Sequence, residues 1–304
     1  MPNDLENQTS VLTGAKQTML SWSRVIESYE AVPEVYKDFF KTQIGNYLEF
    51  PFVVLAPALD RFPHWTTEKL ICNSNETITI LERRGKQIVT IGFPLKTIRE
   101  VETGNILLRS WVTIRGVTSE GVSASSTVEF NAATGERYFS SFLKNIRPAP
   151  GSADETELKA EQAKFDSLAL ANFKLMNLGR ASLVRGENVI QIVLQAEIRK
   201  RAWALFGWAF YQTVTPAYLT ILTDKELILI QDAERSAGKR AARYGSVQRY
   251  IPLKSILSVA LAEQENDLLA LSIQLSSDEC LTKVFEVSAK REIEHLRDEI
   301  GKLI

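Results

Sequence analysis

Two stretches of the chain, FPLKTI at Phe93–Ile98 and IPLKSI at Ile251–Ile256, are near copies of each other. Their prolines lie 158 positions apart, since 252 minus 94 gives 158. Self-similarity at a fixed offset is the sequence signature of a repeated structural unit. We therefore predict that the chain contains two copies of one fold.

The segments around these motifs repeat in the same order. ITIL at Ile78–Leu81 corresponds to LTIL at Leu219–Leu222, and Val128–Phe130 corresponds to Val284–Glu286. The distance from this first motif to the proline is 16 residues in the first copy and 33 in the second. The second copy therefore contains an insertion of about 17 residues, which we place within Asp232–Arg249.

Each copy contains seven runs rich in β-branched and aromatic residues, bounded by turn residues, which predict seven strands. In the first copy these are Phe50–Ala56, Glu68–Cys72, Thr77–Glu82, Gln87–Ile91, Lys96–Glu102, Ile106–Arg115 and Ser123–Asn131. In the second they are Glu187–Ile198, a weak strand near Gln212, Ala217–Thr223, Leu227–Gln231, Tyr250–Leu261, Leu268–Leu275 and Leu281–Val287. Glycine-containing turns are predicted at Glu82–Lys86 and Thr103–Asn105.

An amphipathic helix is predicted to end each copy. Its apolar stripe is Tyr138, Phe139, Phe142, Leu143 and Ile146 in the first copy, and Ala289, Ile293, Leu296, Ile300 and Leu303 in the second. Between the copies, Arg147–Asp154 has the Pro, Gly and Ser content of a linker. Glu155–Leu178 lacks Pro and Gly and predicts a helix ended by Gly179, and Pro33–Ile44 predicts a helix before the first copy.

Seven strands followed by a helix, with the fifth strand beginning at the Pro-Leu-Lys-Ser/Thr-Ile motif, resemble the pleckstrin-homology-like (PH-like) fold, in particular bacterial PH-like domains. The resemblance implies a mainly β protein with some α structure: two tandem barrels, each capped by its C-terminal helix, joined by a helical linker. The predicted domains are a polar tail (1–33), a first PH-like domain (34–147), a linker with a helix (148–178) and a second PH-like domain (179–304).

Composition excludes several classes of function. The 36 basic and 37 acidic residues among 304 give a net charge of −1, which provides no overall basic surface for nucleic acid. The two cysteines, Cys72 and Cys280, and two histidines, His64 and His295, are too few for a Cys/His metal site. We expect both cysteines to be apolar core residues, and we expect no metal or other cofactor.

Two segments bear on localisation. Met1–Gln17 lacks the charged-then-apolar order of a signal peptide, so we expect a cytoplasmic protein. The charge-free run Ala202–Thr223 has the length of a membrane span, but its Gln, Thr and Pro residues argue against a transmembrane helix.

No catalytic residue is nominated. Neither histidine has a nucleophile motif nearby, and GxSxG, Walker and GxGxxG patterns do not occur in the sequence. The acidic residues of the last helix alternate with basic ones, as on a solvated helix face. The sequence therefore favours a protein that is not an enzyme.

Basic residues cluster locally in the second copy. The insertion contains five basic residues and two acidic ones, a net charge of +3, and a second basic cluster directly precedes an aromatic run. The candidate ligand-binding residues are Arg199, Lys200, Arg201, Trp203, Trp208, Arg235, Lys239, Arg240, Arg243 and Arg249. Cations beside aromatic residues are typical of peripheral proteins that enter the headgroups of an anionic membrane, although the same residues could be a solvated loop and a packed core.

Three functional hypotheses follow. The first is an intracellular interaction scaffold of two PH-like modules that binds a protein partner or itself. The second is a peripheral membrane protein that binds anionic lipid through the second copy, and the third is an enzyme with an unrecognised cavity site. The resemblance places phosphoinositide-binding residues near Arg199–Arg201, but the Arg-x-Arg that usually follows in the second strand is absent from Gln212–Pro216.

Overall fold

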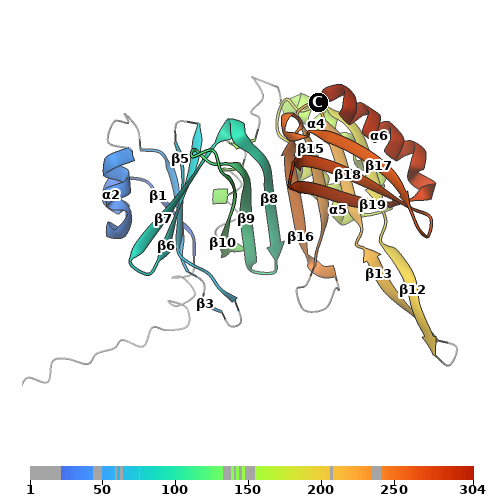
Figure 1. Ribbon diagram of the computed structural model, residues 1–304, viewed down its shortest axis with the longest axis horizontal. Helices are drawn as coiled ribbons and strands as arrows, with labels where there is room; N and C mark the ends of the chain where they lie inside the picture. The colour runs from blue at the N-terminus through green and yellow to red at the C-terminus, as the bar shows by residue number, and fades with distance from the viewer. Residues whose placement is uncertain are drawn as a thin grey trace, which may run out of the picture.

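The computed structural model describes residues 22–43, 50–58, 60–61, 64–74, 76–132, 138–139, 142–143, 146–147, 155–205, 208–234 and 241–304. For 60–61, 64–65, 201–205, 208–212, 234 and 241–244 it describes the backbone alone. Figure 1 shows an elongated molecule in which a first half (22–147) and a second half (155–304) lie side by side.

The first half contains strands at all seven predicted places. These are β2 (Phe52–Ala56), β5 (Lys69–Ser74), β6 (Thr77–Arg84), β7 (Gln87–Pro94), β8 (Ile98–Ile106), β9 (Arg109–Val117) and β10 (Ser123–Asn131). Before them come β1 (Arg24–Ile26), a 3-10 turn (Tyr29–Ala31) and the predicted helix α2 (Glu34–Gln43), while β3 (Asp60–Arg61) and β4 (His64–Trp65) form a small hairpin between β2 and β5. Strands β1-β2-β5-β6-β7 make one antiparallel sheet, and helical residues follow β10 at 138–139, 142–143 and 146.

The second half repeats this order with additions. Helices α4 (Glu155–Ala163) and α5 (Phe173–Ser182), separated by a 3-10 turn (Asp166–Leu168), precede β11 (Val189–Gln195). The remaining strands are β12 (Ile198–Leu205), β13 (Trp208–Thr215), β14 (Tyr218–Thr223), β15 (Glu226–Glu234), β16 (Ala241–Pro252), β17 (Ser258–Gln264), β18 (Leu268–Ser276) and β19 (Glu279–Glu286). A 3-10 turn (Val287–Ala289) and helix α6 (Lys290–Leu303) end the chain.

The two copies of the Pro-Leu-Lys motif adopt the same local structure. Pro94 (φ −57°, ψ 133°) and Pro252 (φ −56°, ψ 133°) each end a strand and precede a 3-10 turn, at Leu95–Thr97 and Leu253–Ser255 respectively. Proline suits this position because its φ is fixed near the observed value and its missing N–H ends the strand. The motif therefore makes the same corner between the fourth and fifth strands of each half.

Strand β8 does not pair with β7 of its own half but with β16 of the other. The pairing is antiparallel and extends from Val101 opposite Tyr250 to Ile106 opposite Gly245. It merges strands of both halves into one seven-stranded sheet, β10-β9-β8-β16-β15-β14-β11, and we call the β8–β16 pair the seam. None of the sheets of the described residues closes into a barrel, so the two predicted PH-like barrels are not confirmed.

Three apolar cores fix this arrangement. One lies on a face of the joined sheet and includes Ile114 and Phe139 of the first half together with Ile221 and Ile230 of the second. On the opposite face, the second half packs against β17–β19 and α6, and in the first half α2 covers the outer face of the first sheet. Because the first core includes residues of both halves, the seam is a packed interface as well as a strand pair.

Several sequence predictions for the second half need correction. The helix predicted over 155–178 is interrupted between α4 and α5, and Gly179 lies inside α5, where a Cβ atom would be 2.6 Å from the Phe165 ring. Gly179 is therefore required for close packing rather than for helix termination. Tyr250–Leu261 is divided by the 3-10 turn, and the strand predicted over Glu187–Ile198 is the shorter β11. The weak strand predicted near Gln212 is β13, whereas its partner β12 was not predicted.

Three further details differ from the sequence predictions. Thr103–Asn105 lies inside β8, where Gly104 leaves room for the Trp111 indole, and the turn falls at Leu107–Leu108 instead. Cys72 is buried as expected, but Cys280 is exposed on β19. The α6 stripe is also shorter, since Ile293, Leu296 and Ile300 are fully buried while Leu303 is 40% exposed.

Candidate functional site

One row of paired residues crosses the joined sheet and defines an edge. Gln195 of β11 pairs with Tyr218 of β14, Tyr218 with Gln231 of β15, Gln231 with Val247 of β16, and Val247 with Gly104 of β8. Three connections leave the sheet on the same side of this row: the β12–β13 hairpin, the β15–β16 connection and the β8–β9 turn. We call this side the hairpin edge, and it is the lower side of the molecule in Figure 1.

The β12–β13 hairpin extends from the hairpin edge and pairs with no other strand of the described residues. Near its end, Trp203 pairs with Phe210 and Leu205 pairs with Trp208. Two irregularities in register, at Ile198–Arg199 and at Arg201–Trp203, interrupt the ladder closer to the sheet. Within the charge-free run 202–223, residues 202–205, 208–215 and 218–223 lie in strands, and no helix in the described part of the chain is long and apolar enough to cross a membrane.

Among the described residues, Arg199 and Lys200 lie at the base of the β12–β13 hairpin. Arg199 is exposed at the base of the hairpin, where its Nε donates to Glu197 Oε2 over 2.8 Å, and Lys200 beside it is half-buried. Arg201, Trp203 and Trp208 belong to the hairpin through their backbone, which is the only part of them that the structure describes.

The predicted insertion is a continuation of β15 and β16 beyond the sheet. Glu234 pairs with Ala241, so the strands extend into the region that we expected to be a loop. Arg243 lies in β16, whereas Arg235, Lys239 and Arg240 lie outside the described residues.

Two charged residues of the insertion are paired inside the protein. Arg249 Nη2 lies 3.0 Å from Glu102 Oε2 across the seam, and Asp232 Oδ1 lies 2.5 Å from Lys174 Nζ. When Arg249 and Asp232 are left out of the count, the insertion has four basic residues and one acidic residue, and its net charge stays at +3.

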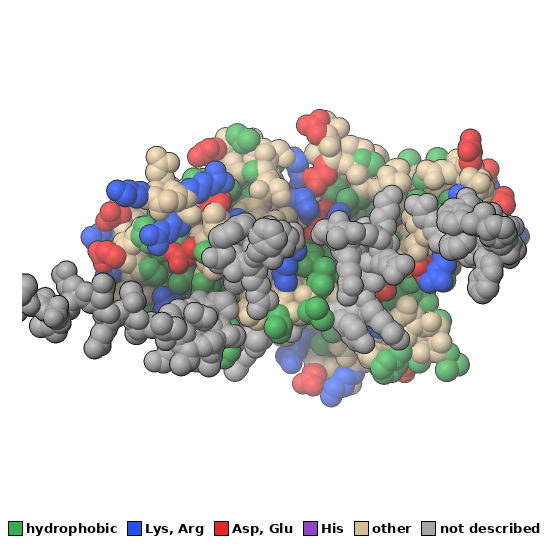
Figure 2. Space-filling view, turned by 90° about the horizontal axis from the view of Figure 1, so that it is seen from below, with side chains coloured by type: hydrophobic (Ala, Val, Ile, Leu, Met, Phe, Trp, Pro, Cys, Tyr) green, Lys and Arg blue, Asp and Glu red, His purple; other side chains and the backbone are tan. Residues whose placement is uncertain are grey.

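The β8–β9 turn adds two residues that the sequence analysis did not single out. Leu107 and Leu108 are 66% and 51% exposed, and Leu107 has φ 56°, in the left-handed region that leucine disfavours. The equivalent turn in the second half has Asn266 (φ 66°) and Asp267 (φ 56°), residue types that accept this conformation. Figure 2 views the molecule from this side, where basic and hydrophobic side chains are visible between the parts drawn in grey.

A buried ionic cluster holds the two halves together beside the seam. Arg147, at the end of the first half, donates through Nε to Glu226 Oε1 (2.8 Å) and through Nη1 to the Ser182 carbonyl (2.6 Å). Its Nη2 contacts Glu226 and Glu187, and its guanidinium lies 4.1 Å from the centre of the Tyr250 ring. Burial, and then the charge of Glu226, raise the pKa of Glu187 to about 8.

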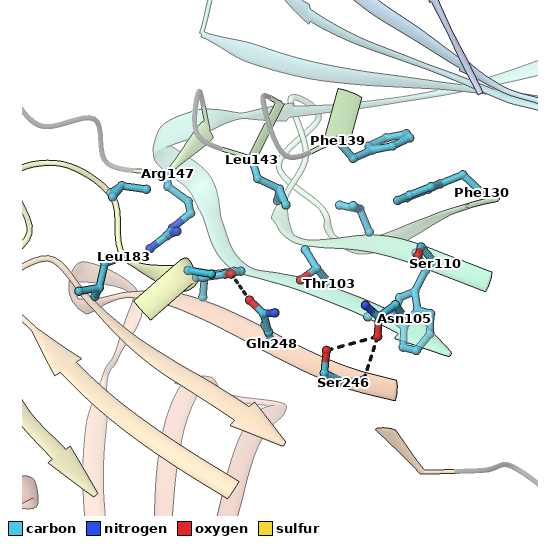
Figure 3. A pocket seen from close by; sticks show the side chains of 16 residues that line it. Thr103, Asn105, Ser110, Phe130, Phe139, Leu143, Arg147, Leu183, Ser246 and Gln248 are labelled. Carbon is cyan, nitrogen blue, oxygen red and sulfur yellow. Dashed lines mark hydrogen bonds between the residues drawn. The ribbon is translucent and has the colours of Figure 1, made fainter. Parts of the chain in front are cut away.

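A cavity of about 470 Å³ lies between this cluster and the seam, as Figure 3 shows. Its wall includes Phe130 and Phe139, stacked with ring centres 4.0 Å apart, and the polar side chains of Thr103 and Gln248. Arg147 also lines it, but the donors of Arg147 are directed at Glu187, Glu226 and Ser182. The guanidinium is therefore committed to joining the halves rather than to binding an anion.

A second cluster flanks the seam on the other face. Arg115 Nη1 lies 2.7 Å from Glu100 Oε1, and Arg249 reaches both Glu100 and Glu102. Burial raises the pKa of Glu100 although the two arginines oppose the shift. Within the described ranges, no group of three His, Cys, Asp or Glu residues is arranged to hold a metal ion.

Comparison with known proteins gives no family for this chain. The sequence matches no protein-family model, and it has no significant match among curated proteins.

Proposed function

We propose that the protein is a non-enzymatic interaction module built from two PH-like halves, and that its hairpin edge binds an anionic lipid surface. The observation that supports this most strongly is the common edge from which three hairpins emerge. The strands that lead into the basic insertion and into the Arg199–Arg201 cluster leave the sheet on one side. The exposed Leu107 and Leu108 lie at that side as well.

The charge available at this edge is sufficient for weak binding. At about 1 kcal/mol per basic residue near an anionic membrane, the net +3 of the insertion contributes roughly 3 kcal/mol, or about a hundredfold in affinity. The Arg199–Arg201 cluster adds charge at the same edge, although Glu197 neutralises part of it. Because such attraction is screened by salt, binding through charge alone disappears at high ionic strength.

Apolar residues supply the part of binding that salt does not remove. The β12–β13 hairpin pairs Leu205 with Trp208 where it is farthest from the sheet. Tryptophan is enriched at the membrane interface because its ring is amphipathic, and leucine enters the acyl region. Arginine and tryptophan are also enriched at protein–protein interfaces, so a protein-binding scaffold is the alternative that vesicle binding must separate.

The test is co-sedimentation of the full chain with vesicles of phosphatidylserine and phosphatidylcholine, and with vesicles of phosphatidylcholine alone. We expect salt-sensitive binding to the anionic vesicles only. Arg240→Ala with Arg243→Ala should reduce it at low salt, and Trp203→Ala with Trp208→Ala should reduce the binding that persists as salt rises.

The matched control removes two basic residues from the opposite end of the sheet. Arg185 precedes β11, and Lys225 lies in the β14–β15 turn. Both residues are at the end of the sheet opposite the hairpin edge. Arg185→Ala with Lys225→Ala should leave vesicle binding unchanged. Lack of binding by the wild-type protein at low salt, or an equal loss in this control, would overturn the proposal and favour the protein-binding scaffold.

A further inference from the structure

The seam is an interface between non-equivalent strands of the two halves. Each half has seven main strands, which are β2 and β5–β10 in the first half and β11 and β14–β19 in the second. The seam joins the fifth of these in the first half, β8, to the fourth in the second half, β16. Because the halves repeat, each of these strands has a counterpart in the other half. The 158-residue offset relates β16 to β7 and β8 to β17, so Gly245–Tyr250 corresponds to Gln87–Gly92 and Val101–Ile106 corresponds to Val259–Gln264.

These two counterparts lie at the margins of the described sheets. β7 is the last strand of the first sheet, and β17 is the first strand of the β17-β18-β19 sheet. Among the described residues, β7 pairs only with β6 and β17 pairs only with β18. Within one chain, the β8–β16 pair forms one interface of this kind. The counterpart of β16 is the marginal strand β7, and the counterpart of β8 is the marginal strand β17.

The backbone of β7 is oriented for strand addition. Arg84 and Gln87 flank a two-residue turn, and the residues that close such a turn hydrogen-bond to each other. Alternate residues, Ile88 and Thr90, consequently direct their N–H and C=O groups away from β6. Gly92, two residues after Thr90, confirms this alternation, because its carbonyl also points away from β6 and accepts a hydrogen bond from the Ser119 N–H (2.9 Å).

The same phase holds in the seam. Ile106 and Arg109 close the two-residue β8–β9 turn, so Asn105 and Thr103 direct their backbone groups toward β16. Glu263 and Leu261 occupy the corresponding positions in β17, whose last residue, Gln264, also directly precedes a turn. Transposing the register of the seam thus places Glu263 opposite Ile88 and Leu261 opposite Thr90.

Charge is complementary at the ends of these strands. The turn before β7 has three exposed basic residues, and the end of β17 with its turn has three exposed acidic ones. The basic residues are Arg83, Arg84 and Lys86, and the acidic residues are Glu263, Glu265 and Asp267. Three of these residues also form ion pairs within the chain, Arg83 with Glu68, Arg84 with Glu82 and Glu263 with Lys290, so the new contact competes with these pairs. In the transposed register Gln264 faces Gln87, which brings the acidic turn beside the basic one.

We propose that β17 of one molecule adds to β7 of a second copy of this chain, in the register of the seam. The partner is thus the chain itself, and the contact is heterologous, because different surfaces of the two copies meet. Because each molecule carries one β7 and one β17, the association proceeds head to tail. This inference is independent of lipid binding.

The intermolecular contact is weaker than the seam. At the positions of Arg249 and Glu102, which form an ion pair in the seam, the new contact has Ile91 and Ala260. The loop that reaches Gly92 through Ser119 also shortens the available edge of β7. Contacts of this limited size are reversible, and the charged turns make the association sensitive to salt.

The test uses two proline variants that remove one outward N–H each. Thr90→Pro disables β7, and Glu263→Pro disables β17, while each variant keeps the other edge intact. Both side chains are exposed, and proline is tolerated on edge strands where the N–H does not bond within the sheet. Thr90→Val and Glu263→Asp are the controls that keep the N–H, and the second also keeps the negative charge.

Analytical ultracentrifugation over a range of protein concentrations measures the assembly. We expect concentration-dependent oligomers for the wild type and for both controls, fewer at high salt, and monomers for each proline variant alone. An equimolar mixture of the two proline variants should form a 1:1 dimer and nothing larger, because only one competent interface remains. Misfolded variants cannot produce this complementation.

Two results would overturn the proposal. One is a wild-type protein that remains monomeric up to its solubility limit. The other is a failure of the proline variants to behave as expected. Either variant alone still forms oligomers, or their mixture contains no dimer although each variant retains the wild-type circular dichroism spectrum. Neither result bears on vesicle binding, which depends on the hairpin edge.

Discussion

The two halves share one order of elements but differ in what they add to it. In the first half the described part of the connection from β2 to β5 contains the short β3–β4 pair, and the β6–β7 turn has two residues. In the second half the corresponding connections are the β12–β13 hairpin and the extended β15–β16 pair. The common part therefore determines the fold, and the additions concentrate the candidate binding residues in one half.

The largest expected effect tests whether the second half depends on its C-terminal helix. Ile293, Leu296 and Ile300 are fully buried, and burying three such side chains contributes about 5–9 kcal/mol, less roughly a third for a compact unfolded chain. This is comparable to the net stability of a domain. Truncation after Val287 should unfold the second half.

Hydrogen exchange followed by mass spectrometry checks this prediction. We expect loss of protection in β14, β15 and β18, with protection retained in β5 and β6 of the first half. Because β8 then loses β16 as its neighbour, its protection should fall as well. A truncated protein that melts at the parent temperature would mean that α6 is an appendage.

The next effect concerns the cluster that joins the halves. Arg147→Ala leaves Glu226 buried without its cation and removes a hydrogen-bond donor from Glu187, which costs about 3–5 kcal/mol. Arg185→Ala removes an exposed arginine that lies 3.7 Å from Glu155, and it should cost less than about 1 kcal/mol. Urea denaturation of both variants measures the difference, and equal midpoints would show that the cluster does not stabilise the joined state.

The same cluster predicts a dependence of stability on pH. Burial and Glu226 raise the pKa of Glu187 to about 8 in the folded state, above its ordinary value of 4.5. The folded protein therefore holds a proton that the unfolded chain releases, and stability is complete below pH 4.5 and decreases as pH rises through 8. At about 1.4 kcal/mol per pH unit, the loss is on the order of a few kcal/mol.

Glu187→Gln isolates this contribution. Glutamine resembles the protonated carboxyl group, and its oxygen can accept the bond that the Val184 N–H now donates to Glu187 (2.9 Å). We expect the variant to be more stable than the wild type at pH 8 and to lose less stability between pH 5 and 8. Parallel stability profiles for the two proteins would mean that Glu187 is ionised throughout.

The sequence was sufficient for the main strands but not for their partners. Period-two alternation and turn residues located all seven main strands of the first half, because these patterns depend on the local burial of each strand. The seam depends on which edges meet, and no periodicity in β8 or β16 encodes that choice. Arg147 was accordingly assigned to a linker, although it is the residue that connects the halves.

Glycine and leucine at special positions were the other source of error. Gly179 was interpreted as a helix end, since glycine most often has that role, but it is needed beneath Phe165. The turn at Leu107–Leu108 was missed because neither residue favours a turn. Comparison with the second copy would have revealed this turn, because the equivalent turn there contains Asn266 and Asp267.

The smallest expected effect uses this last difference. In Leu107→Asn, the positive φ of 56° is occupied by a residue type that accepts it, so stability should rise by up to about 1 kcal/mol. The same change removes an exposed leucine from the hairpin edge, and if that side chain enters the membrane, vesicle affinity should fall by about tenfold. Val122→Asn is the control, since Val122 is 58% exposed at the far end of β9 and should leave vesicle affinity unchanged. A stability gain together with unchanged vesicle affinity would show that the leucine is strained for a reason other than lipid binding, whereas opposite changes in the two measurements would identify it as a residue kept for function at a cost in stability.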